Sequence, residues 1–393
     1  MNRYIPTIKF SCLCSSFWMS FCIVFNYAAM YLLSVGYSSS QIGVIIAVCG
    51  LISAMLQPVI AGVADRGSAG TIRRLILALA VFMILCAAVL MVPGLHFLFH
   101  ALFYGLLVAV LQMLTPLVNA VGMECINHGI SVNFGLARGI GSVSFAFASF
   151  IAGTVIERFS TTVIPVLIIF CYLLVLLAAC AFCFHYKTEA GAETAVPCAE
   201  GGNGSFFASY KKFTVLLIGI SLLFVCHNML NNFMFQVMTY HHGGSREMGI
   251  AAGISASLEL PTMILFSLMI KRISSGNLLK ISGVFFVLKA FFTFVATGIG
   301  GVYGAQTAQM FGFALFTPAS VYYTNSLIRP SDRAKGQAFM TATNTIGSVF
   351  GSLLGGFLID GPGLPAMLLT SVIFAVIGAV LVFLSVERCI DTV

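Results

Sequence analysis

Charged residues are scarce in this chain of 393 residues: Asp, Glu, Lys and Arg together make up only 8% of it, whereas 60% is hydrophobic. A water-soluble protein of this length needs a much larger polar exterior to cover its apolar interior. The mean hydropathy of +1.04 therefore excludes a soluble globular domain. It indicates a chain whose outer surface meets lipid, because lipid needs no polar cover.

Catalytic and nucleotide-binding signatures are also missing. The sequence has no His-Glu-x-x-His pair, no Gly-x-Ser-x-Gly elbow and no glycine-rich loop before Lys-Ser or Lys-Thr. We therefore expect no enzyme, no ATP-driven pump, no metal and no cofactor. A receptor is disfavoured because the longest polar segment has only about 25 residues. The net charge of +7 is spread one to three residues per loop, so we expect no nucleic-acid partner.

What the sequence has in abundance is apolar runs of membrane-spanning length, about 20 residues each. Backbone polar groups must be paired inside lipid, so each run is predicted to be a helix and the chain to be an all-α membrane protein. We place twelve transmembrane helices at 10–34, 41–63, 73–92, 96–125, 134–157, 162–185, 212–238, 248–270, 278–299, 302–326, 334–359 and 365–386.

Basic residues predict the orientation of these spans. With the N-terminus in the cytoplasm, fifteen Lys and Arg side chains fall on the cytoplasmic side and only Arg158 and Arg246 fall outside. This bias follows the positive-inside rule and predicts that both termini are cytoplasmic. We expect a multi-pass protein of the plasma (inner) membrane that is a monomer in the lipid bilayer.

The one long polar stretch, 186–210, divides the spans into two sets of six. We expect an N-terminal six-helix bundle over 1–185, a cytoplasmic linker over 186–210 and a C-terminal six-helix bundle over 211–393. The halves are similar: 23 residues separate Gly43 from Arg66 in one and Gly249 from Arg272 in the other. This spacing favours two pseudo-symmetric bundles.

Several segments resemble the major facilitator superfamily (MFS). AGVADRGSAGTIRR (61–74) is similar to its cytoplasmic loop signature, with Ala61 and Ser68 where glycine is usual. Further stretches resemble its lactose permease and phenylpropionate permease-like branch, namely LQPVIAGVADR (56–66), TPLVNA (115–120), FGLARGIGSVSFAFASFIAG (134–153), LELP (258–261) and IKRISSGNLLKISG (270–283). The resemblance implies the MFS fold and a proton-linked importer that works by alternating access.

Carried over position by position, the resemblance gives Arg138 the role of a substrate contact and Glu259 that of the membrane carboxylate. Lys289 stands where the sugar permeases have Arg. The chain departs from the branch at Asn119, which replaces an acidic residue. It departs again in span ten, where Gln306, Gln309 and Gly312 replace Lys, His and Glu. Whether protons are coupled, and by which route, therefore stays open.

Ionisable groups inside spans indicate function independently of the family, since a charge at the bilayer centre costs about 2.5–3.5 kcal/mol on insertion scales. Glu259 and Lys289 lie in neighbouring antiparallel spans and are candidates for an ion pair, either functional or purely structural. Glu259 is the predicted proton-coupling carboxylate, with His227 as a second candidate. Arg138 begins a polar, small-residue stripe, although an arginine there can also extend to the membrane surface.

Amide side chains supply the remaining substrate-binding candidates, because several together are suited to line an aqueous path. They are Asn228 and Asn231 of span seven, with Asn26, Asn119, Gln309 and Asn344, and the hydroxyl of Tyr27 is a candidate of the same kind. Amides in lipid also bridge helices without any substrate. On the loop after span two, Asp65, Arg66, Arg73 and Arg74 are predicted to close the cytoplasmic side, or else serve only as topology signals.

These observations predict a secondary active transporter that moves a small solute, sugar-like or an aromatic or organic acid, by proton symport. The alternatives are a multidrug-type exporter and a passive uniporter of the same superfamily. Arg138 and Lys289 suit an anionic solute, whereas the amides suit hydroxyl groups, so the solute itself and the direction of transport stay open.

Overall fold

The computed structural model describes residues 5–65, 70–127, 130, 132–182, 206–329 and 332–387. Within these ranges every regular element is helical, as predicted. In chain order the elements are α1 (Ile5–Phe21), η1 (Cys22–Asn26), α2 (Ala28–Val35), α3 (Ser39–Asp65), α4 (Thr71–Val89), α5 (Phe97–Asn127), α6 (Phe134–Phe159), η2 (Thr161–Val163), α7 (Ile164–Ala181), α8 (Phe206–Ser209), α9 (Lys211–Asn232), α10 (Met234–Tyr240), α11 (Ser245–Met269), α12 (Ser275–Val295), α13 (Ile299–Thr307), η3 (Ala308–Met310), α14 (Phe313–Leu327), α15 (Arg333–Asp360) and α16 (Leu364–Ser385).

Eleven helices of the described ranges are long and apolar enough to cross a membrane. They coincide with eleven of the predicted spans. The twelfth, predicted over 302–326, is divided into α13, η3 and α14, so no single helix there reaches the length of a span. Of the predicted linker, 186–205 lies outside the described residues, and 206–209 forms the short helix α8.

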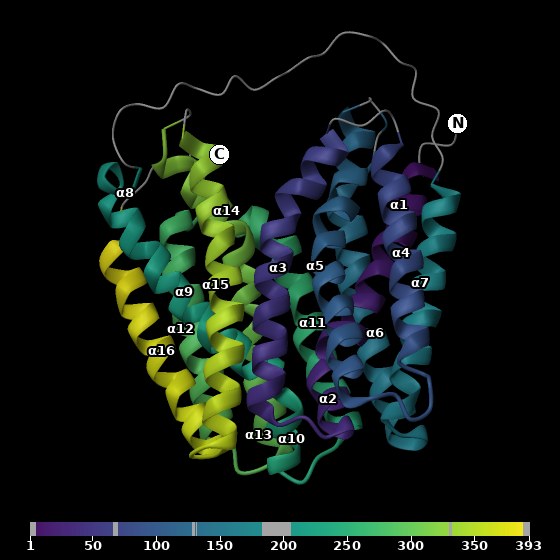
Figure 1. Ribbon diagram of the computed structural model, residues 1–393. Helices are drawn as coiled ribbons and strands as arrows, with labels where there is room; N and C mark the ends of the chain where they lie inside the picture. The colour runs from purple at the N-terminus through teal and green to yellow at the C-terminus, as the bar shows by residue number, and fades with distance from the viewer. Residues whose placement is uncertain are drawn as a thin grey trace.

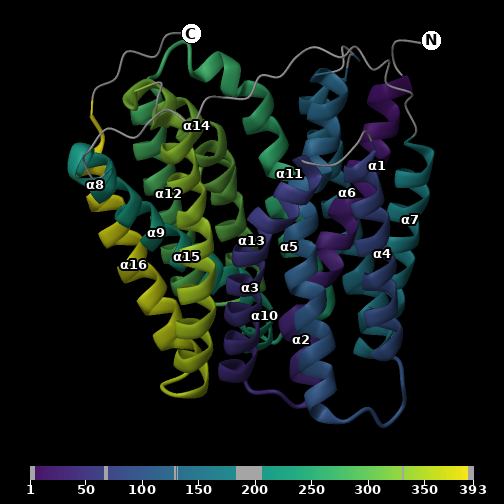
Figure 2. The same cartoon turned by 45° about the horizontal axis from the view of Figure 1, so that its top comes forward.

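The helices stand roughly side by side, with the purple and blue first half on one side and the green and yellow second half on the other (Figure 1). Helix α1 begins and α16 ends at the same end of the molecule, which we call the termini end; the opposite end is the far end. The turned view shows the same separation (Figure 2). The halves meet along two pairs of helices, α3 with α15 and α6 with α11.

At the far end these pairs cross with almost no space between their backbones. A Cβ atom on Gly153 of α6 would lie 2.5 Å from the carbonyl oxygen of Ser245 and 3.3 Å from the Cα of Gly249 in α11. A Cβ atom on Gly43 of α3 would overlap the Ser352 carbonyl of α15. Such contacts need glycine, because only a missing side chain lets two helices approach this closely. The two halves are therefore sealed together at the far end.

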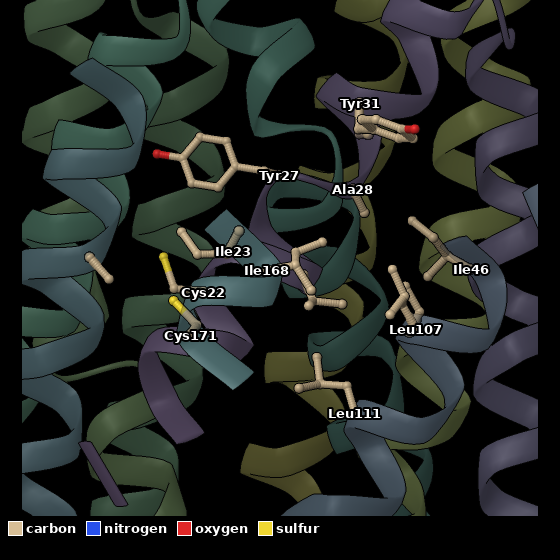
Figure 3. Close-up of a cluster of buried hydrophobic side chains, with 14 of the residues drawn as sticks. Cys22, Ile23, Tyr27, Ala28, Tyr31, Ile46, Leu107, Leu111, Ile168 and Cys171 are labelled. Atoms are coloured by element: carbon tan, nitrogen blue, oxygen red, sulfur yellow. The ribbon is translucent and has the colours of Figure 1, made fainter. Parts of the chain in front are cut away.

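The first span is interrupted where the π-helix η1 meets Tyr27. Buried side chains surround this break (Figure 3): Cys22, Ile23, Tyr27, Ala28, Tyr31, Ile46, Leu107, Leu111, Ile168 and Cys171. Tyr104 of α5 donates a hydrogen bond to the Val24 carbonyl at 3.0 Å, and Tyr27 donates to the Ser149 carbonyl at 2.7 Å. The irregular backbone is thus held by neighbouring helices, as lipid requires.

The break in span ten is stabilised in the same way. Thr262 of α11 donates its hydroxyl to the Met310 carbonyl at 2.8 Å, and Ser282 of α12 donates to the Gly312 carbonyl at 2.8 Å. Both carbonyls lie where the helix changes from η3 to α14. Interrupted helices at membrane depth are typical of binding sites, because their freed polar groups face a shared interior.

Candidate functional site

A chain of hydrogen bonds between buried and half-buried side chains joins four helical elements of the second half. Lys289 in α12 is only 3% exposed, and its ammonium donates to Gln309 Oε1 of η3 at 2.8 Å. It also donates to Asn231 Oδ1 of α9 at 3.2 Å. Gln309 Nε2 in turn donates to Glu259 Oε1 of α11 at 3.2 Å. The expected proximity of Glu259 and Lys289 is thus found, but the Gln309 amide connects them instead of a direct ion pair.

The direction of each hydrogen bond follows from chemistry. An ammonium can only donate, so it makes Gln309 Oε1 and Asn231 Oδ1 acceptors, and both amide nitrogens must then donate outward. Asn231 Nδ2 contacts His227 Nε2 at 2.8 Å, which makes that nitrogen an acceptor and leaves the imidazole proton on Nδ1. We call Glu259, Gln309, Lys289, Asn231 and His227 the polar chain. Its cation is in the centre, and it has one proton acceptor at each end.

His227 lies in an aromatic cage at its end of the polar chain. Its ring stacks on Phe313 with 5.0 Å between centroids and meets the edge of Phe286 at 5.6 Å. Its Nδ1 atom is buried and has no hydrogen-bond partner among the described residues. An unsatisfied buried donor is costly, about 1–3 kcal/mol, so this nitrogen is a natural partner for a water molecule or another polar group.

Arg138 belongs to the other half of the molecule. It lies near the start of α6, with its guanidinium 3.8 Å from the centre of the Trp18 ring of α1, and it donates to Ser142 Oγ at 3.0 Å. The guanidinium is thus held by Trp18 of α1 and by Ser142 of its own helix. The role of Arg138 as a substrate contact stays a prediction. The site carries two cations against one carboxylate.

The other amide candidates are placed differently. Asn228 is buried and donates back to the Phe224 carbonyl of its own helix at 2.9 Å. Tyr27 is fully buried and bonded to the Ser149 carbonyl. Asn26 and Asn119 are half-buried, and Asn344 is exposed on α15. Of the amide candidates, only Asn231 and Gln309 have hydrogen bonds within the polar chain.

The predicted gating residues are only partly described. Asp65 is the last residue of α3, and Arg66 lies outside the described residues. Arg73 donates to the carbonyls of Ala179 and Cys180 at 2.8 and 3.0 Å, so it caps the end of α7 within its own half. Arg74 donates to Thr71 Oγ1 at 3.2 Å, one turn away. Neither of these bonds reaches the second half.

Two functional positions escaped the sequence analysis. Trp18 supplies the aromatic face under Arg138, and its position as the single tryptophan of the chain, inside a span, was a usable signal. Asp360, the last residue of α15, accepts from the backbone N–H groups of Ser39 and Ser40 at 3.1 and 2.6 Å. This carboxylate joins the two halves at the far end, and no local pattern pairs it with a helix start more than 300 residues away.

Comparison with known proteins identifies the family of the chain. The family model "MFS_1 like family" matches residues 14–369. The chain is 24% identical to a maltose permease of Geobacillus stearothermophilus over 379 residues, which is 94% of this chain and 93% of that protein.

Solved transporter structures have the same fold. The nucleoside transporter NupG superposes with a TM-score of 0.75 at 16% identity, covering 98% of both chains. An inward-facing, unoccupied bacterial homologue of the human lysosomal transporter Spinster has a TM-score of 0.68 at 15% identity, covering 98% of this chain and 96% of that one. The chain is an integral membrane protein and a member of the MFS_1-like family of transporters.

Proposed function

We propose that this chain is a proton-coupled importer of a small hydroxylated solute, and that the polar chain is its coupling site. The observation that carries the proposal is the continuous set of hydrogen bonds from Glu259 through Gln309, Lys289 and Asn231 to His227. Burying a lysine and a glutamate costs free energy that apolar side chains would save. A transporter gains from retaining them, because both ends of the chain can take up a proton.

Protonation at either end changes the bonding of Lys289. A proton on His227 Nε2 converts an acceptor into a donor, which then opposes the donor Nδ2 of Asn231. The Asn231 amide must turn, and its oxygen leaves the ammonium. A proton on Glu259 removes the negative charge that holds Gln309 Nε2 and offsets the cations. The charge state of the site is thereby linked to the contacts between α9, α11, α12 and η3.

The proposed solute position lies between the polar chain and Arg138. Arg138 offers guanidinium donors and Trp18 an aromatic face, a combination that suits a ring bearing hydroxyl groups. The relatives named for maltose and nucleoside transport handle solutes with such hydroxyls. An aromatic or organic acid is the second candidate solute, favoured by the excess of one positive charge among Arg138, Lys289 and Glu259.

We further propose alternating access between the two six-helix bundles, with the linker joining them. The sealed far end corresponds to the state that is open towards the termini end. The basic residues favour a cytoplasmic termini end in a plasma membrane. Asp65 with Arg66, Arg73 and Arg74 is proposed to close that end in the opposite state.

Uptake into proteoliposomes tests this function. Labelled maltose, a nucleoside and an aromatic acid are offered with an imposed proton gradient and again after an ionophore has collapsed it. Symport predicts accumulation of one solute above its outside concentration only with the gradient. Equilibration without accumulation would identify a uniporter, and gradient-driven expulsion of lipophilic cations would identify the exporter alternative.

A further inference from the structure

A narrow apolar groove runs along the lipid-facing side of the second half, between α12 and α16. Its volume is about 260 Å³, and only hydrocarbon side chains line it: Val287, Val376, Ala379, Val380, Phe383 and Leu384. The five residues from α16 have the i, i+3, i+4, i+7, i+8 spacing of one helix face. Phe383 and Leu384 are 47% and 74% exposed, so the groove is open to the surroundings of the protein.

One end of this groove carries a cation. The ammonium of Lys280 lies 5.8 Å from the centre of the Phe383 ring. Lys280 precedes Val287 by seven residues, so both lie on the same face of α12, two turns or about 10 Å apart. Because α16 runs antiparallel to α12, Phe383 and Val376 repeat that spacing on the opposite wall. The groove therefore extends from the Lys280 level towards the middle of the membrane.

The charge of Lys280 is not balanced by a neighbouring carboxylate in the described ranges. Glu387, a carboxylate at the same end of the molecule, forms its ion pair with Lys212 at 3.7 Å. Lys280 itself lies five residues after the first residue of α12, about 7.5 Å into the helix from the termini end. At that depth a lysine bends its ammonium towards the headgroup layer while its methylene stem covers apolar surface.

We propose that this groove is a binding site for one anionic phospholipid of the termini-side leaflet. An acyl chain fills the hydrocarbon slot between α12 and α16, and Lys280 binds the headgroup phosphate. The apolar walls fit an alkyl chain and offer nothing to a polar ligand. The cation of Lys280 at the headgroup end supplies a preference for anionic over zwitterionic lipid.

Native mass spectrometry of the purified chain, titrated with phosphatidylglycerol or phosphatidylcholine, tests this site. One lysine near an anionic headgroup predicts about a fivefold preference for phosphatidylglycerol. Lys280→Gln is expected to bind the two lipids equally well. Val380→Phe, which fills the groove, is expected to retain less of both lipids. Lys271→Gln changes an exposed lysine of the same end outside the groove and is the matched control.

The proposal is overturned if Lys280→Gln keeps the wild-type preference, or if Lys271→Gln loses it equally. It is also overturned if Val380→Phe retains both lipids as well as the wild type does. Lys280→Gln and Val380→Phe alter half-exposed and exposed positions, respectively. A circular-dichroism melt of each variant verifies that the helices are intact.

Discussion

The contact of Asp360 with the start of α3 predicts how firmly the far end is closed. The first N–H groups of a helix have no acceptor within their own helix. At Ser39 and Ser40 the Asp360 carboxylate supplies both acceptors from the other half of the molecule, at 3.1 and 2.6 Å. Asp360→Asn keeps the size of the side chain but leaves a single neutral acceptor oxygen.

The expected magnitude follows from the lost bond. A hydrogen bond to a charged group contributes about 1.5–3 kcal/mol, and Asp360→Asn removes one such bond. The opening equilibrium of the far end should therefore rise by about 10- to 150-fold. A smaller additional loss comes from the carboxylate's favourable position at the positive end of the α3 dipole, about 0.3–1 kcal/mol.

Hydrogen–deuterium exchange of the Ser39 and Ser40 amides measures that opening directly. Exchange in Asp360→Asn should be faster by the stated factor in peptides covering the start of α3. Asp332→Asn is the matched control, because Asp332 lies at the other end of α15, where it contacts Lys335 at 3.5 Å and accepts from the Tyr210 hydroxyl at 3.4 Å. Equal exchange in wild type and Asp360→Asn would refute the reasoning.

Three further changes test other parts of the structure. Gly249→Ala places a methyl group at the α6–α11 crossing and should lower the free energy of unfolding by about 1–3 kcal/mol, measured as a lower thermal midpoint. Gly304→Ala is the control, because a Cβ atom there meets open space and should not lower the midpoint. Lys289→Met removes the central donor of the polar chain, so counterflow exchange should fall at least tenfold, and unchanged exchange would contradict a functional chain. Trp18→Ala removes the aromatic face under the Arg138 guanidinium, a cation–π contact that contributes about 0.5–2 kcal/mol. The KM for solute should rise about 2- to 30-fold, and Trp18→Phe should restore most of the affinity.

Hydropathy alone located the spans because burial in lipid is decided locally, by some twenty consecutive apolar residues. It could not reveal the break in span ten. Carbonyls at the break accept hydrogen bonds from Thr262 and Ser282, which lie in other spans, so the information is not in the segment itself. The break lies beside Gln309, which is bonded to both Glu259 and Lys289.

The candidate site was predicted as a set of residue types and only partly as an arrangement. The cost of midplane charges singled out Glu259 and Lys289, which the structure joins through Gln309 instead of the direct ion pair considered from the sequence. The role of Gln309 as their connection depended on the fold of α13–α14, and Asn228 differs from Asn231 in the contacts it makes. The two amides are three residues apart, so the sequence places both on nearly the same face of the span and cannot tell which of them reaches the neighbouring helices.

The most direct test of the central claim compares two kinds of transport in proteoliposomes containing Glu259→Gln. A neutral amide at position 259 cannot gain or lose a proton, although it keeps an oxygen for Gln309. The account predicts that accumulation driven by a proton gradient is abolished while solute counterflow persists, and that Glu387→Gln, a change at an exposed carboxylate, affects neither. Full gradient-driven accumulation by Glu259→Gln would contradict it.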